Sequence, residues 1–331
     1  MIEKNTYIYY LKALAIFSVV CAHCTLIPDG AGTTTTAAAN VLDYIGTMGV
    51  PIFFIVSGYL FCGSKRGFAN FWKRKALTEV LPRIVCESLL YLYVVIRKGG
   101  ASITGYIVFV LGYKYTTYYL TVLIVFYMAF WKIGEKRLAL YSFLSVWALS
   151  VISTGAGSGL DIVNRWTGTF YLNPLNWMGF FIIGMLLVRF KKLDTVLEKI
   201  SHLAWFWLVL SVLYYFVCHH SNVRIFYFSR YALIGHFINI LLLAGLAGWL
   251  RKYGISFLEK LGEKSYSVYL LHQFISGFIA AITNITGPLL FLLVMRPFIV
   301  ILLVMCGLII LEMINKRCGR LDIVFKVIGS R

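Results

Sequence analysis

The sequence predicts an all-α polytopic membrane protein, a bundle of about ten transmembrane helices. Of its 331 residues, 60% are hydrophobic and 17% are aromatic, and the mean hydropathy is +0.82. Only 13% are charged, against about 25% in an ordinary soluble domain. A soluble globule cannot bury so large an apolar share, and a disordered chain needs the opposite composition. In a membrane, lipid solvates the apolar exterior of such helices.

Ten apolar runs are candidates for spans, and each needs roughly 20 apolar residues to cross. They lie at about 7–27, 42–62, 80–96, 117–133, 138–153, 174–190, 202–218, 231–249, 266–284 and 288–311. Residues 101–113 are apolar but too short to cross, which favours an interfacial or re-entrant segment. The threonine- and alanine-rich stretch at 33–39 is expected to be loop. No internal repeat and no appended soluble domain is visible, so we expect one integral-membrane domain over 1–331.

The basic residues indicate how the chain is oriented. If both termini are cytoplasmic, 22 of the 31 Lys and Arg residues fall in inside segments and six fall outside. This asymmetry follows the positive-inside rule and favours an even number of spans. It also explains the net charge of +18 without a nucleic-acid partner, and it leaves membrane lipid as the expected surroundings. We expect the plasma membrane, as in a bacterial inner membrane, with both termini cytoplasmic.

The seven cysteines fall mostly inside apolar runs, so they indicate packing rather than a secreted disulfide framework. Cys21 and Cys24 have the spacing of a redox or metal motif, but they lack a second pair of ligands. We therefore expect no metal site.

The first span carries two polar residues, and polar groups inside a membrane are functional candidates by default. Lys12 and His23 are eleven residues apart, close to three helical turns, and lie roughly 16 Å apart along the helix axis. Histidine is suited to general-base chemistry near neutral pH. Two structural interpretations stay open: Lys12 extending to the inner interface, and His23 as a packing residue.

Three further charged residues lie inside spans. Arg83 and Glu87 are spaced i, i+4 on the third span, so they can pair on one helix face. Arg296 precedes Pro297 in the last span, where a kink is expected. It could be a buried cation that locks the bundle, paired with Glu87. A purely structural Arg83–Glu87 ion pair also remains open, and the intramembrane His236 and His272 are interpreted as structural.

Several motifs follow one another over most of the chain. They are Lys12 with His23, Gly49-Val-Pro-Ile-Phe-Phe-Ile-Val-Ser-Gly-Tyr59, Phe71-Trp-Lys-Arg-Lys75 with Pro82, Tyr118-Tyr-Leu120, Phe180-Phe-Ile-Ile-Gly184, and Leu261-Gly-Glu-Lys-Ser-Tyr-Ser-Val-Tyr-Leu-Leu-His272. In this order they resemble the acyltransferase-3 family of integral-membrane acyltransferases, many of which O-acetylate cell-surface polysaccharides.

The sequence departs from that family in three respects. Lys12 stands where arginine is common, which keeps the charge but loses the bidentate fork for phosphate. The family's Arg-x-x-Arg element is incomplete, because Thr78 follows Lys75 three places on. We also expect no counterpart of the extracellular esterase-like domain that some members carry.

The resemblance implies that an acetyl group moves from cytoplasmic acetyl-CoA to a hydroxyl of a cell-surface or lipid-linked glycan. His23 would act as general base on the acceptor hydroxyl, and a covalent acetyl-histidine is the less favoured course. The extended pantetheine arm is about as long as the Lys12–His23 separation. The candidate catalytic residues are His23 and Glu87, and the candidate donor-binding residues are Lys12, Lys73, Arg74, Lys75 and Arg83. Positive-inside topology alone would also explain why three basic residues stand together at 73–75.

Two other functions are compatible with the pattern. A transporter or flippase for a small or lipid-linked substrate would also combine many spans with a few buried charges. A non-catalytic scaffold is disfavoured, because a passive anchor rarely carries such residues. The sequence indicates neither the acceptor nor the oligomeric state.

Overall fold

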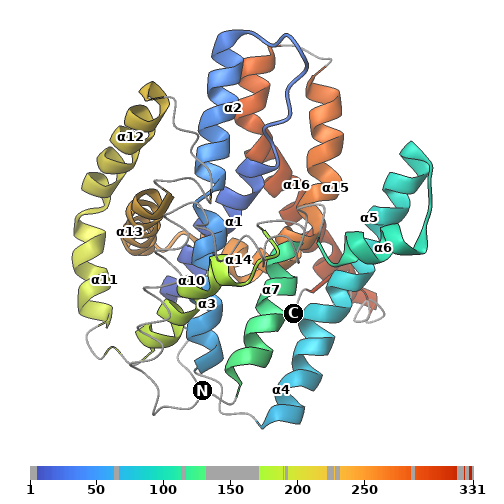
Figure 1. Cartoon of the computed structure of the whole chain (residues 1–331), viewed down its shortest axis with the longest axis horizontal. Helices are drawn as coiled ribbons and strands as arrows, with labels where there is room; N and C mark the ends of the chain where they lie inside the picture. The colour runs from blue at the N-terminus through green and yellow to red at the C-terminus, as the bar shows by residue number, and fades with distance from the viewer. Residues whose placement is uncertain are drawn as a thin grey trace. The chain divides into compact units, whose positions relative to one another are not determined.

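The computed structural model describes residues 6–62, 67–112, 117–131, 171–188, 193–221, 232–284 and 288–318, with the positions 190, 227, 324, 328 and 329. Every regular element in these ranges is helical, which confirms the all-α class (Figure 1). The helices are α1 (Thr6–Ala22), α2 (Thr33–Gly46), α3 (Gly49–Cys62), α4 (Phe68–Lys75), the π-helix η1 (Ala76–Val80), α5 (Leu81–Lys98), α6 (Ile103–Val110), α7 (Tyr118–Phe130), α10 (Leu175–Leu187), α11 (Leu193–His202), α12 (Ala204–His220), α13 (Ala232–Arg251), α14 (Ser256–Glu263), α15 (Ser265–Thr283) and α16 (Leu289–Cys318).

Four of these helical stretches are long and apolar enough to cross a membrane. They are Thr33–Phe61, Ala232–Arg251, Ser265–Thr283 and Leu289–Arg317. The pair α11 and α12, bent by 67°, makes a fifth if it is one span. Large apolar side chains on α12, such as Trp205, Phe216 and Val217, are more than half exposed, as expected of helices that face lipid.

The predicted count of ten spans is therefore not confirmed. Three of the ten runs form shorter apolar helices, α1, α7 and α10, with 17, 13 and 13 residues, and about 20 are needed to cross. Helix α5 is long enough but carries four charged residues. The run at 138–153 lies outside the described residues.

Residues 33–39 are helical, so the loop expected there is wrong. Five positions of α2 are buried, and Tyr44 is one of them. The other four, Thr35, Ala39, Leu42 and Gly46, are spaced by four, three and four residues, so they define one helix face. Ala39 and Leu42 pack into an apolar cluster with Cys21. Burial of this face outweighs the weak helix propensity of the threonines.

The chain folds into two compact units, each assembled from segments that are distant in the sequence. The first contains residues 1–11, 50–68 and 102–255, and the second contains 12–49, 69–101 and 256–331. The assignment of a single domain over 1–331 stays a prediction.

In the first unit, α3 and α10 approach each other at two glycines. A Cβ on Gly58 would overlap the carbonyl oxygen of Phe181, and a Cβ on Gly184 would overlap that of Ile55. Small residues at a crossing let two membrane helices approach closely. The glycines of two sequence motifs, 49–59 and 180–184, are thus explained by packing between these helices.

We expect Gly184→Ala to destabilise the protein by about 1–3 kcal/mol, because the added methyl group forces α3 and α10 apart. Gly307→Ala on α16 is the matched control, since a Cβ there meets nothing within 4 Å. Thermal unfolding in detergent measures both variants. Equal unfolding midpoints for the two variants would contradict the close approach of α3 and α10.

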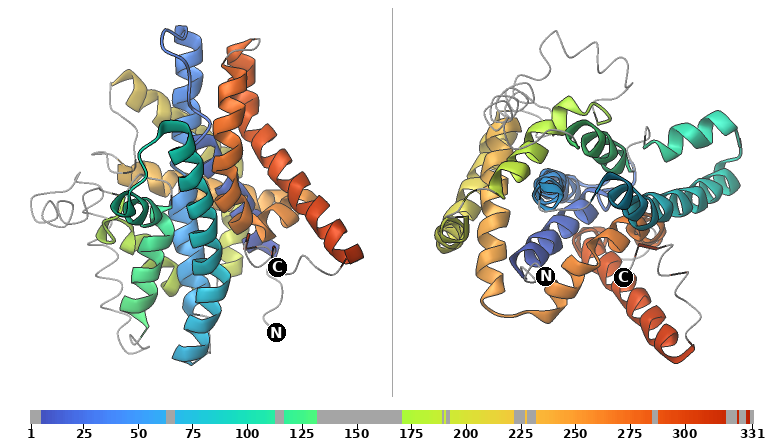
Figure 2. Two further views of the ribbon diagram at one scale, coloured as in Figure 1. Left: turned by 90° about the vertical axis from the view of Figure 1, so that its right-hand side faces the viewer. Right: turned by 90° about the horizontal axis from the view of Figure 1, so that it is seen from below.

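The second unit is built around α15 and α16, which pack against each other (Figure 2). Helix α5 packs on α15, and α2 packs on α16. Helix α1 crosses the junction of α2 and α3, where the Ser18 hydroxyl donates to the carbonyl of Ile45 over 2.5 Å. A Cβ on Gly49 would overlap the carbonyl oxygen of Ala15. This arrangement holds the end of α1, and the residues that follow it, inside the second unit.

Candidate active site

His23 lies in the turn directly after α1, one residue beyond the helix end at Ala22. The first predicted span extended to residue 27, so the helix is shorter than expected and His23 is not part of it. Its backbone N–H donates to the carbonyl of Val20 over 3.1 Å. The residue as a whole is partly buried.

The imidazole of His23 contacts that of His272. The two ring centroids are 5.0 Å apart, with 50° between the planes. His272 lies on α15 and its side chain is completely buried. Its Nδ1 is 3.1 Å from the carbonyl oxygen of Val268, whereas no described residue forms a hydrogen bond with its Nε2.

The second predicted cluster, Arg83 and Glu87, lies on α5, as the sequence indicated. Both side chains are buried, with 5% and 3% of their surface exposed. Arg83 interacts electrostatically with Tyr269, Glu87 and Tyr266. Two of those partners are on α15, the helix that also carries His272.

Helix α15 therefore connects the two predicted clusters. Tyr266, Tyr269 and His272 follow one another at intervals of three residues, so they occupy neighbouring positions on successive turns. The ring centroids of Tyr269 and His272 are 6.0 Å apart. His23 and Arg83, 60 positions apart in the chain, thus belong to one buried group of polar side chains in the second unit.

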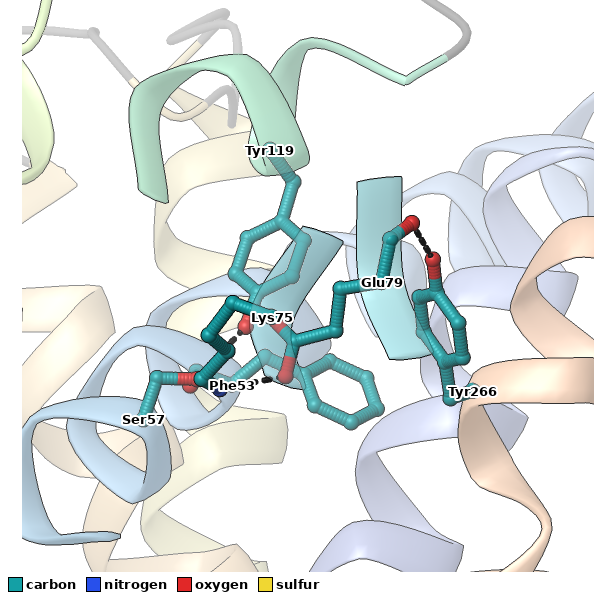
Figure 3. A network of polar contacts seen from close by, with 6 residues as sticks. All are labelled: Phe53, Ser57, Lys75, Glu79, Tyr119 and Tyr266. Carbon is teal, nitrogen blue, oxygen red and sulfur yellow. Dashed lines mark hydrogen bonds and ion pairs between the residues drawn. The ribbon is translucent and has the colours of Figure 1, made fainter. Parts of the chain in front are cut away.

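A π-helical segment, η1, connects α4 to α5 just before Arg83. The carboxylate of Glu79 in this segment pairs with the ammonium of Lys75, and its backbone carbonyl accepts a hydrogen bond from the hydroxyl of Tyr266 (Figure 3). Lys75 also lies 5.8 Å from the centre of the Phe71 ring. Such π-insertions are frequent at functional sites, and here Tyr266 connects the insertion to α15.

The remaining predicted donor-binding residues lie on α1 and α4. Lys12 is half-buried on α1, and Lys73 and Arg74 are exposed in the last turn of α4. Lys75 is half-buried and paired with Glu79. Arg83 is thus the one predicted donor-binding cation, among these described residues, whose side chain is buried.

Arg296 is not paired with Glu87, and that suggested pairing is wrong for the described residues. Its guanidinium is completely buried and donates to the Thr283 hydroxyl over 2.7 Å and to the Asn284 side-chain oxygen over 2.5 Å. It also donates to the backbone carbonyls of Cys24 and Leu26. Arg296 therefore holds the chain just after His23, and it connects that segment to the end of α15.

Three contributors to the site could not be assigned from the sequence, namely Tyr269, His272 and Arg296 in their observed contacts. A signal for the first two was present in the motif at 261–272, where aromatic and histidine side chains recur every three residues. The sequence alone favours a structural role for His272. Its contact with His23 joins positions 249 apart in the chain, which no local pattern predicts.

The described residues contain no group of three His, Cys, Asp or Glu side chains that could hold a metal ion. The side chains around His23 comprise its own imidazole, the buried imidazole of His272 beside it and the buried guanidinium of Arg83. A neutral imidazole can accept a proton from a hydroxyl, and a buried guanidinium can bind an anion.

A family model described as an acyltransferase domain (Acyl_transf_3) matches residues 5–313, nearly the whole chain. No curated protein and no solved structure is significantly similar to the chain. The matched range contains the whole buried group, from His23 to Arg296.

Proposed function

The chain belongs to the acyltransferase-3 family, and from that membership we propose that it transfers an acetyl group from cytoplasmic acetyl-CoA to a hydroxyl of a cell-surface or lipid-linked glycan. His23 carries the proposal, because its imidazole contacts that of the buried His272. An enzyme that removes a proton from a hydroxyl needs a base that is held in position, and the contact with His272 supplies this.

In the proposed reaction, a nitrogen of His23 accepts the proton of the acceptor hydroxyl while its oxygen attacks the thioester carbonyl. The new C–O bond forms, the C–S bond breaks, and the thiolate of CoA leaves. The leaving thiolate takes up the proton that His23 holds, which restores the neutral imidazole. No metal takes part in this scheme.

The donor is an anion, and buried cations bind phosphate through charge-assisted hydrogen bonds. Arg83 is the proposed phosphate ligand, because its side chain is buried and lies close to Tyr266 and Tyr269. Glu87, one turn further along α5, orients the guanidinium. Lys73, Arg74 and Lys75, at the end of α4, would form the outer part of the donor site, and Lys12 would border it on α1.

The proposal is tested with purified protein in detergent, acetyl-CoA, and a panel of sugar oligomers as acceptors. Free thiol and acetylated sugar are measured together. Equal amounts of thiol and of a sugar ester are expected, since one C–S bond breaks for each C–O bond formed. An absence of acetyl-CoA binding and of thiol release, in protein that is folded, would overturn the proposal and favour transport of a small or lipid-linked substrate.

We expect Arg83→Gln to weaken acetyl-CoA binding by about 10–100-fold, which corresponds to one charge-assisted contact of about 1.5–3 kcal/mol. Removing Arg83 alone leaves the Glu87 carboxylate buried beside it, so the double variant Arg83→Gln/Glu87→Gln separates donor binding from destabilisation. Lys316→Gln at the exposed end of α16 is the control for charge alone. Calorimetric titration measures the Kd, and an unchanged Kd in both Arg83 variants would contradict this role.

A further inference from the structure

His272 is completely buried and has one occupied and one unoccupied ring nitrogen. Nδ1 is 3.1 Å from the Val268 carbonyl oxygen, an acceptor, so Nδ1 carries the proton of the neutral ring. Nε2 then presents a lone pair, and no described residue donates to it. A buried polar atom without a partner costs about 1–3 kcal/mol, so its presence calls for a physical reason.

The surroundings of Nε2 distinguish it from the other buried polar atoms without a partner in the described residues. The hydroxyls of Ser265 and Ser267 are also without a partner, but a hydroxyl rotates freely, whereas the ring fixes the position of Nε2. The ring of His272 lies with its centroid 5.0 Å from that of His23. At this separation, a nitrogen of one ring comes within hydrogen-bonding range of a nitrogen of the other once the rings turn edge to edge.

We propose that His272 is a positioning residue for His23: its Nε2 accepts a hydrogen bond from one ring N–H of His23, which leaves the lone pair of the other nitrogen to take the acceptor's proton. This inference rests on the proposed function and names the partner of its base. His23 gains a proton from the hydroxyl and later gives it to the leaving thiolate, while His272 neither gains nor loses one. The contact fixes the tautomer and orientation of His23, a role that a carboxylate has in other catalytic groups.

The backbone around His272 keeps this acceptor in place. Nδ1 is tied to Val268 one turn earlier on the same helix, so the ring cannot turn over without losing that hydrogen bond. The ring of Tyr269 packs 6.0 Å away. On the other side, Arg296 holds the carbonyls of Cys24 and Leu26, which limits the movement of the His23 turn. Both members of the pair are therefore held by the surrounding structure of the second unit.

The test compares His272→Phe, which removes the acceptor, with His272→Gln, whose side-chain oxygen restores one. His236→Phe is the matched control, because His236 is also buried and bonded to a backbone carbonyl, that of Tyr227 over 3.0 Å. Its ring packs against Phe180 and Tyr227. Thiol release from acetyl-CoA is measured with two kinds of nucleophile. Water or a sugar hydroxyl must lose a proton to attack, and hydroxylamine attacks through a neutral nitrogen.

We expect His272→Phe to lower kcat with the hydroxyl nucleophile by about 100-fold or more, within the range of general-base contributions. The KM for acetyl-CoA stays unchanged, thiol release with hydroxylamine is largely kept, and His272→Gln recovers part of the lost rate. Three results would overturn the inference: a kcat equal to that of His236→Phe, equal losses with both nucleophiles, or no recovery in folded His272→Gln. If the wild-type protein releases no thiol with any nucleophile, the proposed function itself fails.

Discussion

Replacing His23 by alanine is expected to lower acyl transfer by about 100–10,000-fold, the usual contribution of a general base. His23 lies in the turn after α1, outside any helix, so we expect its replacement to leave the helices in place. The protein should remain folded and inserted in the membrane, and acetyl-CoA should still bind. Transfer of a labelled acetyl group to a sugar acceptor measures the effect.

The matched control for this variant is His220→Ala, at the exposed end of α12. It removes an imidazole of the same size from a surface position, and we expect wild-type activity. If His23→Ala retained the turnover of His220→Ala, another group would be the base. Accumulation of an acetylated His23 in the wild-type protein would instead indicate the covalent course.

The second large effect is expected from Arg296→Met. The substitution keeps a long apolar stem but removes every donor that binds Thr283, Asn284 and the two carbonyls at Cys24 and Leu26. Each buried acceptor left without a donor costs about 1–3 kcal/mol. We therefore expect a loss of at least about 3 kcal/mol and a clear fall in Tm in detergent.

Activity should fall as well, because the turn that carries His23 loses its anchor. Arg296→Lys keeps the charge and up to three donors, so it should recover part of the stability and activity. Lys316→Met, at an exposed position of the same helix, is the control for replacing a cation. A Tm of Arg296→Met equal to that of Lys316→Met would show that the anchor contributes nothing to stability.

The sequence identified the helical class and the location of most helices, because long apolar runs leave few alternatives to a helix in lipid. It also placed Arg83 and Glu87 on one helix, since their spacing is a local property. The ends of the helices were harder to predict from the sequence. Helix α1 ends at Ala22, before the apolar run does. This end was not predicted, because composition says nothing about where a chain turns.

The structure of 33–39 illustrates a second kind of miss. Threonine-rich segments have weak helix propensity, and the burial that favours the helix comes from Cys21 and Leu293 elsewhere in the chain. The same reason explains why the contacts of His272 and Arg296 were not predicted. Both reach the segment after α1 from positions about 250 to 270 residues away, so only tertiary structure brings them together.

The most direct test of the central claim is a titration of acetyl-CoA against purified wild-type protein and His23→Ala, with free thiol followed in parallel. An acyltransferase that depends on His23 predicts acetyl-CoA binding by both proteins and thiol release by the wild type alone. Thiol release by His23→Ala at the wild-type rate would contradict it.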